Sequence, residues 1–140
     1  MQIFEGPPSP LEKCGSNARG SCSRLVGMAR LTIRIDFDDG SGLGPGKVRL
    51  LELVAETGSI RKAAAGMKMS YRKAWLLLKA LEKTFGRPLI ETTTGGARGG
   101  GASLTALGEA VVTRYREIGR EAARGSARHL TYLSNKAMRK

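Results

Sequence analysis

The most informative segment of this sequence is residues 70–85, SYRKAWLLLKALEKTF. Apolar side chains recur in it at helical spacing, while basic side chains occupy the other sides of the same helix. Ser70 is a residue type that caps helix N-termini, and Gly86 followed by Pro88 marks the end. The segment therefore predicts an amphipathic helix with a basic exposed surface. Its expected buried face comprises Ala74, Leu77, Leu78, Leu81 and Phe85.

A shorter helix is predicted directly before it. Ser59 is a good N-cap for residues 60–67, in which Ala63 and Ala64 are small enough to let another helix pack closely. A break at residues 68–69 separates the two helices. Two helices joined by a turn of a few residues, the second of them basic and amphipathic, are typical of a helix-turn-helix.

Further elements are predicted on both sides of this pair. Upstream, residues 31–38 alternate apolar and polar side chains like a half-buried strand, and residues 47–57 have helical spacing up to Gly58. Downstream, residues 89–92 and 103–104 are predicted to be strands around a glycine-rich loop, which together would form a wing. We therefore predict a mainly α fold with a small antiparallel sheet, a winged helix-turn-helix.

The chain ends are predicted to differ from this domain. Residues 1–27 mix Gly, Pro, Ser and Asn without an apolar period, so we expect a disordered tail before a domain of residues 28–124. The last helix of that domain starts at Ala106, after Thr105 as its cap, and residues 125–140 form a basic tail or helix extension. An apolar seam on this helix must be buried, either within the monomer or in a homodimer, and we predict a homodimer. The seam comprises Leu107, Val111, Tyr115, Ile118 and Ala122.

The charge of the chain indicates a polyanionic partner. Its 140 residues include 24 Lys and Arg against 12 Asp and Glu, a formal net charge of +12. Most of the excess lies in residues 59–100, with nine basic residues against two acidic ones, and in residues 101–140, with eight against three. Such an excess suits nucleic acid or an anionic membrane surface.

Membrane and metal binding are not expected. The sequence has no run of about 18 apolar residues and no secretory signal pattern, so we expect a cytoplasmic protein without a membrane partner. Cys14 and Cys22 are too few for a disulfide framework and lack the further ligands of a zinc site.

The first turns of the 70–85 helix are predicted to meet base edges in the major groove of double-stranded DNA. Arg72 or Lys73 would donate to guanine, and the hydroxyls of Ser70 and Tyr71 would bond to phosphates or bases. Trp75 lies in the same turns, although partial packing of its indole into the core beside the first helix is an equal alternative. Four further residues are predicted to hold phosphates and one, in the wing loop, to approach the backbone or minor groove. They are Ser59, Arg61, Lys62 and Lys79, and then Arg98.

The stretch 58–108 resembles the DNA-binding domain of the ModE family of molybdenum-responsive transcriptional regulators. The resemblance rests on short words of sequence: Gly58-Ser59-Ile60, Met69-Ser70-Tyr71-Arg72-Lys73-Ala74-Trp75, Thr93-Thr94-Gly95-Gly96 and Leu104-Thr105. It implies that Ser59 and residues 70–75 face DNA, that the wing at 95–101 lies along the backbone, and that the protein is a dimer. LysR-type regulators share the helix-turn-helix and residues 80–82 and 88–89, but lack the glycine wing.

ModE regulators also carry C-terminal molybdate-binding domains. Only about 20 residues follow the last predicted helix here, too few to fold such a domain. We therefore expect no cofactor, and a DNA-binding chain that responds to another signal or to none.

Three other functions agree less well with the sequence. General nucleic-acid or RNA binding agrees with the charge, but no strand offers an aromatic stacking platform. An interaction module that has lost DNA binding would keep the same fold. An enzyme is not expected, because the single histidine, His129, lies in the weakly patterned tail and no carboxylate pair or activated nucleophile is evident.

Overall fold

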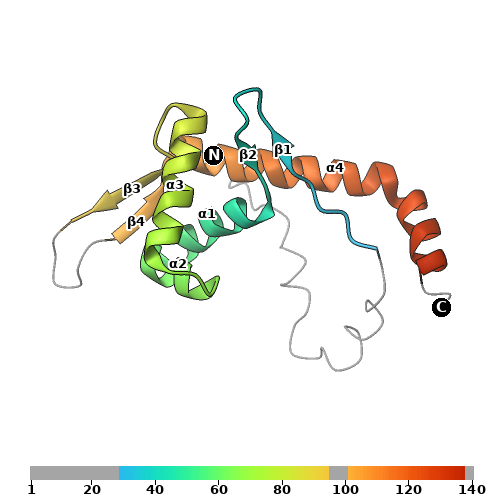
Figure 1. Ribbon diagram of the computed structural model, residues 1–140, viewed down its shortest axis with the longest axis horizontal. Helices are drawn as coiled ribbons and strands as arrows, with labels where there is room; N and C mark the ends of the chain where they lie inside the picture. Colours follow the sequence, from blue (N-terminus) through green and yellow to red (C-terminus); the bar gives the residue numbers. More distant parts are fainter. Residues whose placement is uncertain (1–28, 95–100, 138–140) are drawn as a thin grey trace, which may run out of the picture. The chain divides into compact units, whose positions relative to one another are not determined.

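The computed structural model describes residues 29–94 and 101–137. Helices dominate these ranges, and two small antiparallel sheets accompany them (Figure 1). The predicted fold class, mainly α with a small antiparallel sheet in a winged helix-turn-helix, is confirmed. The elements in chain order are β1 (Ile35–Asp36), β2 (Gly42–Leu43), α1 (Pro45–Thr57), α2 (Ile60–Gly66), α3 (Tyr71–Phe85), β3 (Ile90–Thr93), β4 (Gly101–Leu104) and α4 (Ala106–Ala137).

Residues Leu31–Arg124 form one compact unit whose core is centred on α1. Leu50 and Leu51 of α1 and Leu81 of α3 are completely buried, and each contributes about 1.5–3 kcal/mol by leaving water. Ala63 and Ala64 of α2 are equally inaccessible, which confirms that small side chains let the helices approach closely. The helix-turn-helix is thus fixed to a rigid apolar base.

The first helix begins earlier than its apolar spacing predicted. It starts at Pro45 and not at residue 47, because proline has the backbone φ of a first helical residue and lacks the N–H that would stay unpaired there. Gly58 ends the helix in the left-handed conformation at φ 66°, as predicted. Within this helix Ala55 is exposed, and Val48, Leu50, Leu51 and Val54 are buried.

The strand expected over residues 31–38 is much shorter in the structure. Only Ile35 and Asp36 pair with Leu43 and Gly42, because the chain turns at Phe37, whose N–H donates to the Ser41 carbonyl at 2.8 Å. The period-two alternation is nevertheless real, since the odd-numbered side chains from residue 33 to 37 are half-buried and the even-numbered ones are exposed. The alternation of apolar and polar residues thus predicted which side chains are buried, but not which residues form hydrogen-bonded strand pairs.

The wing strands pair in the register Ile90 to Leu104 and Thr93 to Gly101. The N–H of Ala102 donates to the Gly58 carbonyl at 2.8 Å, so β4 is tied to the turn between α1 and α2. The loop between β3 and β4, residues 95–100, lies outside the described residues.

The last helix, α4, extends to Ala137, well beyond residue 124 where its apolar pattern weakens. Thr105 caps it by accepting the N–H of Gly108 at 3.1 Å, as predicted. Val111 and Tyr115 of the predicted seam are buried, whereas Ile118 is 42% exposed. The core of the monomer therefore buries only the first half of the seam.

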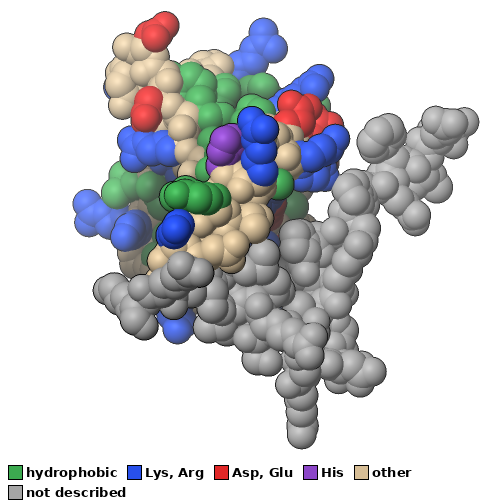
Figure 2. All heavy atoms as spheres, turned by 90° about the vertical axis from the view of Figure 1, so that its right-hand side faces the viewer, with side chains coloured by type: hydrophobic (Ala, Val, Ile, Leu, Met, Phe, Trp, Pro, Cys, Tyr) green, Lys and Arg blue, Asp and Glu red, His purple; other side chains and the backbone are tan. Residues whose placement is uncertain are grey.

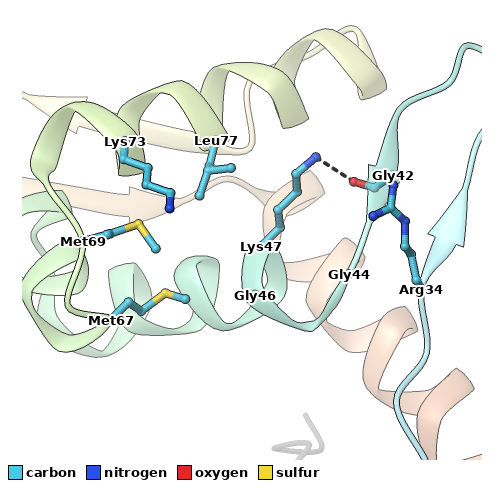
Figure 3. A pocket seen from close by; sticks show the side chains of 9 residues that line it. All are labelled: Arg34, Gly42, Gly44, Gly46, Lys47, Met67, Met69, Lys73 and Leu77. Atoms are coloured by element: carbon cyan, nitrogen blue, oxygen red, sulfur yellow. Dashed lines mark hydrogen bonds between the residues drawn. The ribbon is translucent and has the colours of Figure 1, made fainter.

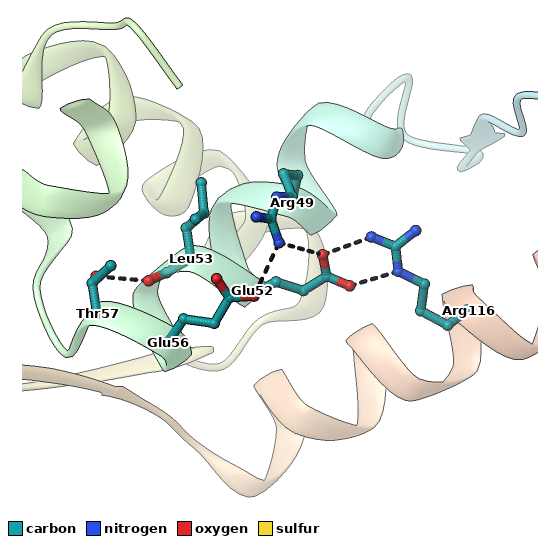
Figure 4. Close-up of polar contacts among 6 residues, drawn as sticks. All are labelled: Arg49, Glu52, Leu53, Glu56, Thr57 and Arg116. Carbon is teal, nitrogen blue, oxygen red and sulfur yellow. Dashed lines mark hydrogen bonds and ion pairs between the residues drawn. The ribbon is translucent and has the colours of Figure 1, made fainter. Parts of the chain in front are cut away.

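Polar contacts fasten α4 to α1. Two guanidinium nitrogens of Arg116 donate to the two carboxylate oxygens of Glu52 at 2.5 and 2.6 Å (Figure 4). Arg49 approaches the same carboxylate at 3.4 Å and Glu56 at 3.0 Å. These hydrogen bonds, which Arg116 donates to Glu52, raise the pKa of Arg116, which stays charged. The bidentate geometry fixes the orientation of the two helices as well as their separation.

The remaining described residues, 29–30 and 125–137, belong to a second unit. Within it, the N–H of Ala29 donates to the hydroxyl of Ser134 at 2.6 Å, and Ser134 is buried. In the part of the chain described, no helix has the length and apolar character needed to cross a membrane.

Tyr115→Phe is expected to lower the free energy of unfolding by about 1 kcal/mol, because the phenol donates to the Ile33 carbonyl at 2.7 Å. Burial raises the pKa of Tyr115 above its ordinary value of 10.0. The unfolded chain therefore loses this proton at lower pH than the folded one, and the contribution falls as pH rises beyond about 10. Urea unfolding from pH 8 to 11 measures both effects. An equal loss in Tyr132→Phe, whose side chain is 62% exposed, would contradict the assignment.

Candidate nucleic-acid interface

The N-terminus of α2 is built by a side-chain cap. The hydroxyl of Ser59 accepts the N–H of Lys62 at 3.3 Å, and the Thr57 hydroxyl donates to the Ser59 carbonyl at 3.0 Å. Ser59 itself is half-buried, whereas Arg61 and Lys62 are exposed in the first turn. The cap thus fixes the start of the helix and leaves two cations facing solvent.

A turn of four residues, 67–70, joins α2 to α3. The N–H of Met69 donates to the Ala64 carbonyl at 3.1 Å, and Lys68 adopts a left-handed conformation at φ 55°. For a residue with a side chain this conformation costs about 1 kcal/mol, which the surrounding hydrogen bonds offset. Ser70 then caps α3 by accepting the N–H of Lys73 at 3.2 Å. Both predicted caps of the helix pair are confirmed.

Two aromatic side chains of α3 are exposed and lie beside cations. Tyr71 is 49% exposed, and the guanidinium of Arg61 in α2 lies 5.9 Å from its ring centre. Trp75, one turn later, is 43% exposed, and the Lys79 amine lies 5.5 Å from its ring. The indole is thus partly exposed, and Trp75 is not among the residues of the hydrophobic core cluster. The face of an aromatic ring attracts a cation without carrying a negative charge of its own.

We call the predicted residues of α2, α3 and their two N-caps the α2–α3 surface. All its members are exposed except Ser59, and Arg61 with Tyr71 joins the two helices. The Lys79 amine also pairs with Glu82 at 2.7 Å, so it would have to exchange a carboxylate for a phosphate. The α2–α3 surface comprises Ser59, Arg61, Lys62, Ser70, Tyr71, Arg72, Lys73, Trp75 and Lys79.

Arg98, predicted at the tip of the wing, lies outside the described residues, so its role stays a prediction. Charge elsewhere is widespread. Lys and Arg side chains are spread over the side of the molecule seen in Figure 2, with acidic side chains at fewer places among the described residues.

A shallow hollow of about 340 Å³ lies beside the α2–α3 surface (Figure 3). Lys73 and Leu77 point into it from α3, and Met67 and Met69 line it from the turn. The Lys47 amine at its edge donates to the Gly42 carbonyl at 2.7 Å. Among the described residues, no group of three or more His, Cys, Asp or Glu could hold a metal ion.

Leu76 is an exposed member of α3 that the sequence reasoning missed. Its side chain is 53% exposed, in the same two turns as Tyr71 and Trp75. A helical wheel carries the signal, because Leu76 falls opposite the buried Ala74, Leu78 and Leu81.

Ser70→Ala is expected to lower the free energy of unfolding by about 1 kcal/mol, because the N–H of Lys73 loses its acceptor. Ser70→Asp keeps an acceptor and is expected to retain the stability, but its negative charge on the α2–α3 surface would weaken binding to a polyanion. Thermal unfolding and a duplex-DNA titration of both variants separate the two roles. Equal stability of Ser70→Ala and the wild type would refute the cap.

The three-helix core, the helix-turn-helix and the paired wing strands define a winged helix-turn-helix domain. Residues 46–109, from α1 through the wing into α4, match the model of the family described as "Bacterial regulatory helix-turn-helix protein, lysR family". This part of the chain is therefore similar to the helix-turn-helix domain of LysR-type regulators.

Curated proteins of similar sequence include ModE regulators. "Transcriptional regulator ModE" of Haemophilus influenzae is 44% identical over 73 residues, which are 52% of this chain and 29% of that protein. "Molybdenum transport protein ModE" of Azotobacter vinelandii is 35% identical over 91 residues, 65% of this chain and 33% of that protein. The chain thus spans about a third of the length of these relatives. The resemblance to ModE expected from the sequence is confirmed over this part.

Among solved structures, one chain of the "Crystal structure of CbnR_DBD-DNA complex" is 29% identical to this protein. The match covers 62% of this chain and 94% of that chain, with a TM-score of 0.48.

Proposed function

We propose that this chain is a sequence-specific transcriptional regulator that binds double-stranded DNA through the α2–α3 surface. The observation that carries the proposal is the LysR-type helix-turn-helix, whose second helix presents an exposed, cationic and aromatic first half on a capped N-terminus. In such motifs the start of the second helix meets base edges in the major groove. The names of the ModE relatives support the regulatory role.

Each part of the α2–α3 surface has a distinct task in this proposal. Arg72 and Lys73 reach base edges or the phosphates that flank them, whereas Arg61 and Lys62 hold the phosphate backbone and set the register. The hydrogen bond from Ala102 to Gly58 keeps the wing beside the start of α2. Arg98 would then meet the sugar–phosphate backbone from the loop of the wing.

Selection of duplexes from a random DNA library tests this function. We expect one enriched sequence that binds at least 1,000-fold more tightly than a scrambled duplex at physiological salt, the lower end of specific recognition. Single-stranded RNA of the same sequence serves as competitor. No enrichment, or displacement by RNA at lower concentration than by the selected duplex, would refute sequence-specific DNA binding.

We also propose that the protein is a homodimer through α4. Two halves related by symmetry would present two α3 helices to successive major grooves, about 34 Å apart along DNA. The support is the apolar seam of α4, in which Ile118 stays 42% exposed although Val111 and Tyr115 are buried. Stable dimers bury such groups.

Ile118→Asp is expected to shift the protein from dimer to monomer, because a carboxylate in an apolar helix contact is not compensated. Sedimentation equilibrium measures the mass, and a helical circular dichroism spectrum like that of the wild type shows that the fold is kept. Replacement of the exposed Glu121 by Ala provides the control. A wild type that is monomeric at micromolar concentration would refute the dimer.

A further inference from the structure

Leu76 is an apolar side chain in a basic part of the surface. Ala74 and Leu78, two positions to either side, are 0% and 5% exposed, whereas Leu76 is 53% exposed. Because residues three and four apart share a helix face, Leu76 lies between Arg72 and Lys79 on the outer side of α3. A leucine therefore stands in the middle of the helix face proposed to enter the major groove.

The two exposed aromatic rings near Leu76 each lie beside a cation, whereas an aliphatic side chain does not attract cations. Tyr71 is held beside Arg61 and Trp75 beside Lys79, and both rings carry a polar group able to bond to DNA. Leu76 has no polar atom, so it gains only from contact with another apolar group. The group that contacts Leu76 should therefore be an apolar group carried by the polyanion that the surrounding cations bind.

The major groove offers one apolar group, the C5-methyl of thymine. A side chain four residues after Arg72 is one helical turn further along the groove, where it meets a base next to that read by the arginine. We propose that Leu76 is a specificity-determining residue that recognises a thymine methyl group. This inference rests on the proposed DNA-binding function and adds to it a base identity.

Replacement of thymine by deoxyuridine tests the proposal, because it removes the methyl group alone. The probes are the selected duplex and copies with each thymine replaced in turn, titrated with wild type, Leu76→Ala and Leu76→Met by fluorescence anisotropy. For wild type we expect an affinity loss of about fourfold at one thymine of each half-site, the effect of burying one methyl-sized group. Leu76→Ala should lose about fourfold on the thymine duplex and nothing further on the deoxyuridine duplex. Leu76→Met should keep the sensitivity.

The outcomes separate the inference from the function on which it rests. If wild type does not distinguish the selected duplex from a scrambled one, the proposed function fails and the inference with it. If wild type binds selectively but Leu76→Ala remains as sensitive to methyl removal as wild type, only the inference is overturned. It is equally overturned if Leu76→Ala changes the sedimentation mass, since Leu76 would then contact a second copy of the chain.

Discussion

Gly108→Ala is expected to lower the free energy of unfolding by about 2–3 kcal/mol, a large part of the stability of a small domain. A Cβ at this position would lie 2.2 Å from the carbonyl oxygen of Leu89 and 3.1 Å from its carbon. The obstacle is backbone and cannot rotate away. The same carbonyl accepts the N–H of Thr105 at 3.0 Å, so moving it also breaks the junction between β3 and α4. The higher helix propensity of alanine offsets only about 1 kcal/mol of this loss.

Gly119→Ala is the matched control, because Gly119 lies in the same helix and a Cβ there meets nothing within 4 Å. It is expected to raise the free energy of unfolding by up to about 1 kcal/mol. Urea unfolding monitored by circular dichroism measures both variants. The packing of α4 against the wing would be refuted if Gly108→Ala were as stable as Gly119→Ala.

Replacement of both Arg72 and Lys73 by Ala is expected to weaken binding to the selected duplex by about 10- to 100-fold. It should also reduce the slope of log affinity against log salt by about 2, since each lost phosphate neutralisation contributes about 0.9. Both side chains are exposed and alanine favours helices, so the fold should persist. Anisotropy titrations from 50 to 300 mM salt give both quantities.

Replacement of Arg120 and Arg124 by Ala provides the matched control for this variant. Both residues are exposed on α4, and their removal costs the chain the same two positive charges. We expect little change in affinity or slope, because a general attraction decays within about 10 Å at these salt concentrations. If the two double variants weakened binding equally, the effect would be one of net charge and not of the α2–α3 surface.

Local signals made much of the helical domain predictable. The caps at Ser59 and Ser70 and the left-handed glycines at 58 and 86 depend on residues within a turn of themselves, and all four are in place. The strand predicted over residues 31–38 was too long. Alternation of apolar and polar residues reflects burial, whereas strand pairing needs a partner strand, and the turn at Phe37 leaves only two residues on each side to pair. The sequence left open whether the chain beyond residue 124 continues the helix or forms a tail, because the apolar spacing fades there although α4 continues to Ala137.

The basic residues of the candidate interface were predictable from the sequence, but its other features were not. Arg61, Lys62, Arg72 and Lys73 follow from caps and cations, whereas the pairing of Arg61 with Tyr71 requires the approach of two helices. Leu76 was overlooked because a leucine in a helix is first assigned to the core. Arg98 stays a prediction, since the structure describes the wing only up to residue 94 and from residue 101.

Chemical-shift mapping of the backbone amides during titration with the selected duplex tests the location of the interface most directly. A 15.0 kDa chain is small enough for this measurement. We predict that the largest changes fall at residues 59–62 and 70–79, and that the scrambled duplex produces smaller ones at the same positions. Changes confined to residues 125–137, with α2 and α3 unaffected, would contradict the proposal that this helix pair binds DNA.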